Sequence, residues 1–320
     1  IHYIDLSTTA RAVAEARAKA RGLTGITFHT GSLLTAPDLG PFDYIDCCGV
    51  LHHLPDPQEG FDALAAALSP DGGIGLMVYA PFGRSGVYPL QEAFGAVLDG
   101  PPQDRLRRAR AIFDRIPDGH PFKRNPNLSD HRQSDAGFYD LLLHSQDRAF
   151  RIGEVLEALD AAGLVMTGSP QAFLYDPVPI LGDAAMVDGM DHRARMMLAE
   201  ALRGTIRTHV IYAGKAGGGA AAARAGPASV PHIKGASGQK LAQAAARAGV
   251  VPVTHDGQKL EIPVPGLAAR ALARIDGRRN LQEIAQGIGT DWLSFAGVWG
   301  GFSDRLCRHG LMFYSGLLRR

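Results

Sequence analysis

The sequence has few cysteines and no long apolar run, and these absences exclude several classes of protein. Only three cysteines occur among 320 residues: the adjacent Cys47 and Cys48, and the distant Cys307. Adjacent cysteines rarely bridge each other and no Cys-x-x-Cys spacing offers a zinc site, so a reducing, cytoplasmic location is expected. No stretch approaches the ~20 apolar residues that cross a bilayer, and the N-terminus lacks the pattern of a signal peptide, so no membrane partner is expected.

Composition and charge predict an ordinary globular chain of two domains. Hydrophobic residues make up 46% and charged residues 20% of the chain, as in soluble proteins. Residues 230–320 hold 12 Lys and Arg against 6 Asp and Glu, whereas the remainder holds 21 against 26. This difference in electrostatic character favours two separate domains, and 320 residues suffice for both at about 150 residues each.

The first 80 residues alternate between short apolar runs and amphipathic stretches. Such alternation with short connections predicts a doubly wound, mostly parallel α/β sheet. One expected strand ends at Asp5, and three more span 26–29, 42–48 and 74–79. One expected helix runs from Thr8 or Thr9 to Arg21, and a second spans 57–68.

The remaining segments predict the domain boundaries. Residues 1–215 are expected to form one domain, with a helical insertion at about 88–150, a strand at 164–168, a helix near 193–203 and a last strand at 208–213. Residues 216–229 are rich in Gly and Ala and predict a linker. Residues 230–320 predict a small basic domain with helices near 238–248, 267–275, 281–287 and 294–309 and a closing strand at 311–314.

One carboxylate stands where a nucleoside cofactor would need it. Asp5 ends the first expected strand and precedes a helix. In Rossmann-like sheets a carboxylate at such a strand tip accepts hydrogen bonds from both ribose hydroxyls. Capping of the following helix is the alternative role.

The stretch "FDYIDCCGVLHHLPDP…ALAAALSPDGGIGLMVY" resembles class I S-adenosylmethionine-dependent methyltransferases. The resemblance covers roughly residues 1–215 and implies S-adenosylmethionine as cofactor. It also implies that Asp5 binds the ribose, that Leu6 packs on the adenine, and that Ser32 and Leu33 contact the adenine edge. By the same resemblance, the floor beneath the sulfonium is Cys48, Gly49 and Val50. Relatives often have Asp at the position of Ser32.

The family's glycine-rich loop would precede Asp5 by about 20 residues. The chain opens at Ile1 in a strand-like stretch, so we expect an N-terminally truncated domain that lacks its first strand and this loop. We therefore expect weak or absent activity from the chain alone.

Methyl transfer needs alignment and sometimes a base. His52 and His53 are the candidate catalytic bases, with helix capping or pocket lining as the alternative. Substrate selection is assigned to Tyr79, Arg84, Tyr88 and Gln91, which follow the fifth strand of the family pattern. Asp140 and His144 stand four residues apart with Asp147 nearby, but no second histidine at metal-ligand spacing follows. We therefore expect no metal.

The C-terminal stretch "ARIDGRRNLQEIAQGI" resembles small winged-helix-like modules attached to some bacterial methyltransferases. The leading hypothesis is an enzyme with a small-molecule or peptide acceptor. The rivals are a tRNA or other nucleic-acid methyltransferase that docks through the basic domain, and a non-catalytic scaffold that binds a partner. The sequence does not decide the oligomeric state.

Overall fold

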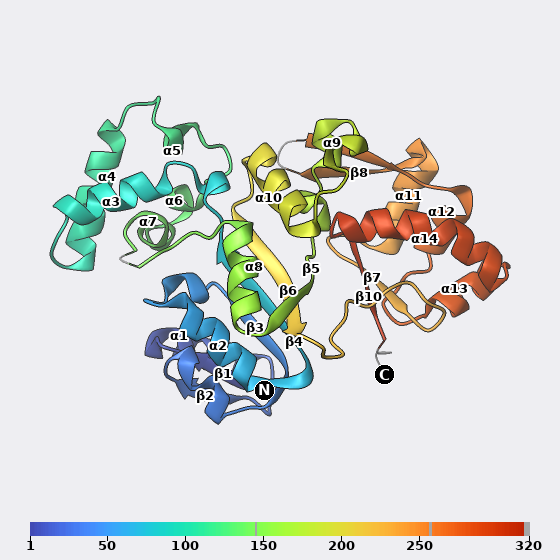
Figure 1. Ribbon diagram of the computed structural model, residues 1–320, viewed down its shortest axis with the longest axis horizontal. Helices are drawn as coiled ribbons and strands as arrows, with labels where there is room; N and C mark the ends of the chain where they lie inside the picture. Colours follow the sequence, from blue (N-terminus) through green and yellow to red (C-terminus); the bar gives the residue numbers. More distant parts are fainter. Residues whose placement is uncertain (145, 256–257, 317–320) are drawn as a thin grey trace. The chain divides into compact units, whose positions relative to one another are not determined.

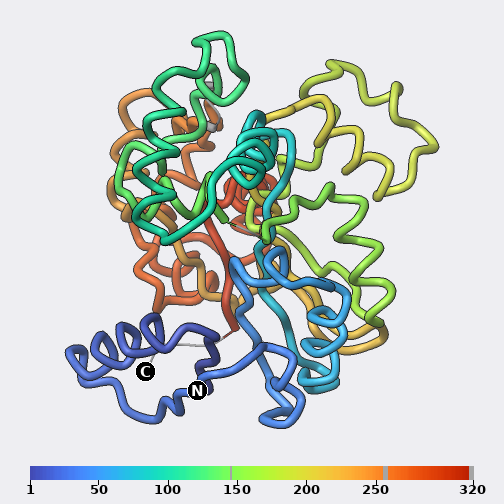
Figure 2. Tube along the Cα trace, turned by 90° about the vertical axis from the view of Figure 1, so that its left-hand side faces the viewer, coloured from blue at the N-terminus to red at the C-terminus, as the bar shows by residue number. Residues whose placement is uncertain are grey.

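The computed structural model describes residues 1–144, 146–255 and 258–316 (Figures 1 and 2). The chain divides into two compact units: Ile1–Thr167 with Ala184–Ala220, and Gly168–Asp183 with Ala221–Arg320. The second unit therefore includes a segment, Gly168–Asp183, from inside the residues that the sequence suggested as the first domain. Within the described residues, no helix is long and apolar enough to cross a membrane.

The strands of the first unit form two sheets. β1 (His2–Asp5) and β2 (Thr27–Thr30) pair in parallel. The second sheet has the order β3-β4-β6-β5, with strands at Phe42–Cys48, Leu68–Tyr79, Thr208–Lys215 and Leu164–Gly168. β3 and β4 are parallel, whereas β4 and β6 are antiparallel.

The expected single sheet is therefore divided between β1 and β3. In the part of the chain that the structure describes, β1 pairs only with β2 and β3 pairs only with β4. Each of these two strands therefore has one edge without a hydrogen-bonded neighbour among the described strands.

Four helices with clear capping signals accompany the strands: α1 (Thr8–Ala20), α2 (Pro57–Ala67), α8 (Ile152–Ala161) and α10 (His192–Arg203). The cap of α1 is Ser7, whose hydroxyl accepts from the Ala10 N–H, rather than the expected Thr8 or Thr9. α8 packs against both α2 and α10, and Figure 1 shows it lying along the larger sheet.

The Pro-Asp-Gly-Gly segment at 70–73 lies inside β4, so this strand begins earlier than the expected start at residue 74. The pairing of β3 with β4 jumps from Phe42–Leu68 to Tyr44–Gly73. The intervening residues bulge from the ladder, and a side chain at Gly72 would lie 2.9 Å from the Phe42 carbonyl oxygen. A glycine is therefore needed where the bulge passes close to its neighbour.

Five helices fill the region of the expected insertion: α3 (Val87–Val97), α4 (Pro102–Arg115), α5 (Pro121–Arg124), α6 (Asp130–Gln133) and α7 (Asp135–Leu142). They bury Phe94, Phe122 and Phe138 in a core of their own. Two of them, α5 and α6, are single-turn helices.

The second unit is built around an aromatic core. Phe295, Trp299 and Phe302 follow one another at helical spacing along α14 (Trp292–Arg308) and are buried. They pack with α11 (Gly238–Ala248), α12 (Gly266–Leu272) and α13 (Leu281–Gly287). Two antiparallel pairs complete the unit: β7 (Val230–Ile233) with β10 (Met312–Ser315), and β8 (Val250–His255) with β9 (Gln258–Pro263). The sequence reading missed β7, β8 and β9.

Candidate functional site

Asp5 lies at the carboxyl end of β1, directly before α1. Residues two apart on a strand share a face, so the hydroxyl of Tyr3 reaches the Asp5 carboxylate and donates to Oδ2 at 2.9 Å. The Ser7 N–H donates to Oδ1 at 2.8 Å. Asp5 therefore does not cap α1 itself; it holds Ser7, which does. The side chain of the next residue, Leu6, is 70% exposed.

Ser32 and Leu33 follow β2 at the start of the 3₁₀ helix η1 (Leu33–Asp38). The Ser32 hydroxyl accepts from the Leu34 N–H at 3.2 Å, which leaves its own O–H as a donor. Leu33 is half-buried and lies against α2 near Gly60.

Cys48, Gly49 and Val50 form the turn that leaves β3. Gly49 has a φ of +79°, and its N–H donates to the Met77 carbonyl oxygen at 3.1 Å. The Cys48 thiol donates to Asp46 Oδ1 at 2.9 Å. Desolvation, followed by this hydrogen bond and the Asp46 charge, raises the pKa of Cys48 to about 11, so the thiol is protonated at neutral pH.

His52 and His53 come directly after this turn, in the 3₁₀ helix η2 (Leu51–His53). His52 is 1% exposed, and its ring stacks on Tyr79 with a centroid distance of 3.9 Å. Burial, and then the nearby His53, Arg84 and His144, lower the pKa of His52 to about 3. This imidazole is therefore neutral at physiological pH and is too weak a base to take a proton there.

His53 occupies a different setting. Its Nδ1 lies 2.8 Å from the Gln146 carbonyl oxygen, and its ring stacks on His144 at 4.1 Å. His144 lies beyond the end of α7, so Asp140 and His144 do not share one helix. Instead, His144 Nδ1 accepts from the Gln146 N–H at 3.2 Å.

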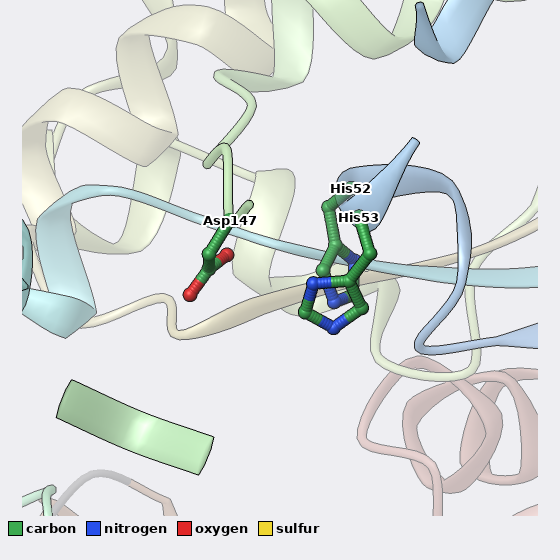
Figure 3. Close-up of side chains that lie close together, drawn as sticks. All are labelled: His52, His53 and Asp147. Carbon is green, nitrogen blue, oxygen red and sulfur yellow. The ribbon is translucent and has the colours of Figure 1, made fainter. Parts of the chain in front are cut away.

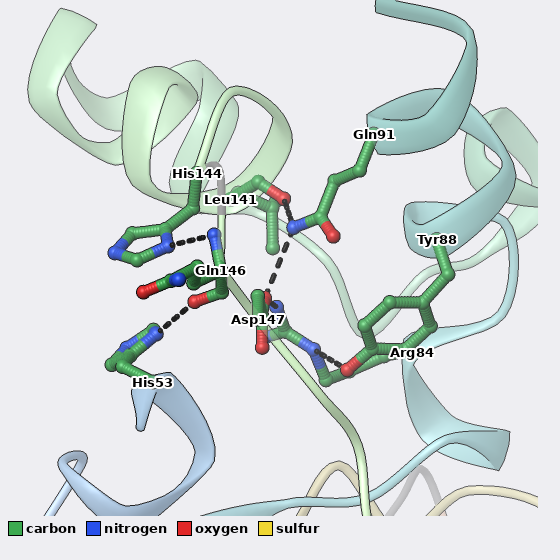
Figure 4. Close-up of polar contacts among 8 residues, drawn as sticks. All are labelled: His53, Arg84, Tyr88, Gln91, Leu141, His144, Gln146 and Asp147. Carbon is green, nitrogen blue, oxygen red and sulfur yellow. Dashed lines mark hydrogen bonds and ion pairs between the residues drawn. The ribbon is translucent and has the colours of Figure 1, made fainter. Parts of the chain in front are cut away.

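The substrate residues predicted from sequence meet around Asp147, as Figure 4 shows. Arg84 Nη2 donates to Asp147 Oδ2 at 3.2 Å, and Gln91 Nε2 donates to the same oxygen at 3.0 Å. Arg84 also donates from Nε to the Tyr88 hydroxyl at 3.1 Å and lies 3.7 Å from the centre of the Tyr79 ring. Tyr79, Arg84, Tyr88 and Gln91 are therefore one cluster, but Arg84 is only 5% exposed and serves the cluster internally.

A cavity of about 470 Å³ adjoins this cluster. It is lined by Tyr88, Gln91, Glu92, Gly95, Arg105, Leu143, His144 and Asp147. Most of these residues are polar or charged, so the cavity offers hydrogen-bonding partners to a small polar ligand. Glu92, Arg105 and Asp147 were not predicted as site residues, because chain folding alone brings Asp147 to Arg84 across 63 residues.

The predicted cofactor-binding residues lie on two different sheets, and only those that follow β3 lead along the chain to the substrate cluster. Only two residues lie between Val50 and His53, so the turn after β3 leads directly into the cluster. Asp5 and Leu6 belong to the other sheet, and no hydrogen bond between described strands joins β1 to β3.

Residues 1–74, which carry Asp5 and this turn, match the family model described as "Methyltransferase domain". This segment is similar to a class I methyltransferase domain. This class uses S-adenosylmethionine, so the cofactor class expected from the sequence is confirmed.

Two solved structures of one protein share the fold of nearly the whole chain. They are PKMT2 from Rickettsia typhi in complex with AdoHcy and PKMT2 without it, with TM-scores of 0.65 and 0.66. Each is 12% identical, and the match covers 98% of this chain and 66% of that one. At this identity the likeness shows a shared mixed α/β fold alone.

One curated relative is similar in sequence. It is an uncharacterized protein, syc1184_c, from Synechococcus, which is 32% identical over 189 residues. The match covers 57% of this chain and 45% of that protein, so the chain spans less than half the length of this relative.

Proposed function

We propose that this chain transfers the methyl group of S-adenosylmethionine to a small-molecule or peptide acceptor. The observation that carries the proposal is the Asp5 carboxylate, fixed by two hydrogen bonds at the tip of β1 within the residues that match the methyltransferase model.

The remaining lone pairs of Asp5 suit a ribose. Each carboxylate oxygen can accept two hydrogen bonds, and the Tyr3 hydroxyl and Ser7 N–H occupy one on each oxygen. One acceptor position per oxygen remains, which matches the two hydroxyls of the sugar. Leu6 offers an exposed apolar side chain to the adenine.

We assign the other cofactor contacts in the same way. Ser32 donates its free O–H to a ring nitrogen of the adenine, beside Leu33. Cys48, Gly49 and Val50 line the floor beneath the sulfonium, where the protonated thiol adds no negative charge.

The acceptor occupies the cavity beside Asp147. The sulfonium methyl is already electrophilic, so the protein has only to align acceptor, methyl and sulfur and to exclude water. Tyr88, Gln91 and Glu92 line this cavity and give the acceptor hydrogen-bonding partners. His52 is neutral and packs against Tyr79 behind this cluster. His53 Nδ1 lies beside the Gln146 carbonyl oxygen, so Nε2 is the ring atom that meets the reacting groups.

Calorimetric titration of the full-length protein with S-adenosylhomocysteine tests the cofactor assignment. We expect saturable binding that weakens at least tenfold in Asp5→Ala. The matched control is Asp38→Ala, which removes an exposed carboxylate at the end of η1 and should bind as the wild type does. Absence of binding by the wild type, or equal binding by Asp5→Ala, overturns the proposal.

The excess of Lys and Arg over residues 230–320 favours a nucleic-acid acceptor as the second candidate, with this winged-helix-like module as the docking surface. In the structure Arg279 and Arg308 are paired with Asp276 and Asp304, which reduces the charge available to phosphates. Binding of labelled tRNA to the full chain that weakens steeply with salt would favour this candidate over a small acceptor.

A further inference from the structure

Three ligand-type side chains converge next to the cavity without forming bonds to one another. His52, His53 and Asp147 each offer one atom, and these atoms lie within 4.8 Å of one another. Figure 3 shows the two imidazoles one in front of the other, with the Asp147 carboxylate beside them on a separate segment.

Two of these side chains carry buried atoms that nothing in the described protein satisfies. Both ring nitrogens of His52 lack a hydrogen-bond partner, although the residue is almost completely buried. Asp147 Oδ1 is also buried and unpartnered. Buried polar atoms without a partner are rare and costly, and here they lie on neighbouring side chains. This coincidence indicates an external ligand.

The surrounding hydrogen bonds orient these side chains as the outer contacts of a metal centre do. The Nδ1 of His53 lies 2.8 Å from the Gln146 carbonyl oxygen, which fixes the orientation of the ring. The second oxygen of Asp147 is held by Arg84 and Gln91. A backbone carbonyl on one histidine nitrogen and donors on the remote carboxylate oxygen are the usual supports of metal ligands.

We propose that His52, His53 and Asp147 bind one divalent transition-metal ion, with Zn²⁺ as the representative. Two neutral imidazoles and one carboxylate are the ligand types that such ions prefer, whereas Mg²⁺ prefers oxygen ligands. The charge of Asp147 is offset by Arg84, so affinity comes from coordination bonds and not from net charge. Ligands of a tetrahedral zinc lie about 3.4 Å apart, so small side-chain rotations close the set.

The three ligands leave a coordination position open beside the cavity. A metal there would polarise an acceptor oxygen and lower the pKa of the acceptor's hydroxyl. The reaction would then not need His53 as a general base. This consequence rests on the proposed function, whereas metal binding itself does not.

The experiment measures binding and not turnover. The metal-stripped full chain is titrated with Co²⁺ and followed by the visible absorption of the bound ion, and the bound Co²⁺ is then displaced with Zn²⁺ or Mg²⁺. We expect one Co²⁺ per chain, displacement by Zn²⁺ but not by Mg²⁺, and an affinity reduced at least tenfold in His53→Ala and in Asp147→Asn. His192→Ala, which removes an exposed histidine from α10, is the matched control and should bind normally.

Thermal unfolding of each metal-free variant shows whether it is folded. If Asp147→Asn is not folded, the affinity of His53→Ala alone decides. Failure of the wild type to bind Co²⁺, an unchanged affinity in folded variants, or an equal loss in His192→Ala overturns the metal site. None of these results bears on S-adenosylhomocysteine binding at Asp5, so the two proposals fail separately.

Discussion

The Arg84 guanidinium and the Asp147 carboxylate form an ion pair in which both side chains are almost completely buried. η3 (Phe82–Arg84) presents the cation, and the segment after α7 presents the anion. The pair therefore ties the loop that follows β4 to the end of the helical insertion.

Removing one partner of this pair should be much more damaging than removing both. Asp147→Ala leaves a buried cation without its counter-ion, and we expect a loss of about 3–5 kcal/mol in the free energy of unfolding. The double variant Arg84→Met/Asp147→Leu should recover most of that loss. Asp304→Ala, in the exposed pair with Arg308, should change stability by less than about 1 kcal/mol. Denaturant unfolding measures the free energy of unfolding of each variant. Equal losses of this free energy in the single and double variants would contradict the prediction.

Gly86 should tolerate no side chain. Its φ is +86°, and an added Cβ would lie 2.2 Å from the Phe122 nitrogen. We expect Gly86→Ala to destabilise the protein by about 2–4 kcal/mol, from the left-handed backbone and the clash together. Gly100 has a φ of +93° but open space around it, so Gly100→Ala should cost only about 1–2 kcal/mol. Similar melting temperatures for the two variants would show that the contact with Phe122 does not exist.

The Cys48 thiol should react slowly at neutral pH. Desolvation and Asp46 raise its pKa to about 11, and only the thiolate is alkylated. The labelling rate with iodoacetamide should therefore rise about tenfold per pH unit up to that value. Asp46→Asn removes the negative charge and leaves a weaker, neutral acceptor, so its Cys48 should label faster at pH 8. Peptide mass spectrometry separates Cys48 from the buried Cys47, and an unaltered rate in Asp46→Asn would refute the explanation.

Tyr3 should support the cofactor through Asp5. Tyr3→Phe removes the hydroxyl that orients Oδ2, and one such hydrogen bond contributes about 0.5–1.5 kcal/mol. We expect S-adenosylhomocysteine to bind about 2- to 12-fold more weakly, a smaller loss than in Asp5→Ala. Tyr44→Phe, on the exposed side of β3, should have no effect. A loss in Tyr3→Phe as large as that in Asp5→Ala would mean that the strand tip itself has collapsed.

Local patterns predicted the elements whose signals are local. The expected strands at 42–48 and 164–168 and the expected helix at 281–287 have the observed bounds. Their ends are marked by nearby residues, as where Asn280 and Glu283 form reciprocal caps at the start of α13. The β8–β9 pair was missed although Val250, Val251, Val253 and Thr254 are strand-forming, because Pro252 interrupts the run.

The candidate site was predictable only where it follows the chain. The motif around "VLHHL" indicated His52 and His53, and the loop after β4 indicated Arg84 and Tyr88. The part played by Asp147 depends on a contact across 63 residues, and the burial of Arg84 depends on Tyr79 and Tyr88 together. No spacing pattern in the sequence encodes either of these.

The left-handed backbone at Gly49 has a mechanical consequence. The turn from Cys48 to Val50 continues without interruption into the single helical turn that holds His53 against Gln146. A molecule that pushed on this turn would also displace the His53 imidazole, which stacks on His144. Occupancy of the turn after β3 would thereby change the position of His144, which lines the cavity.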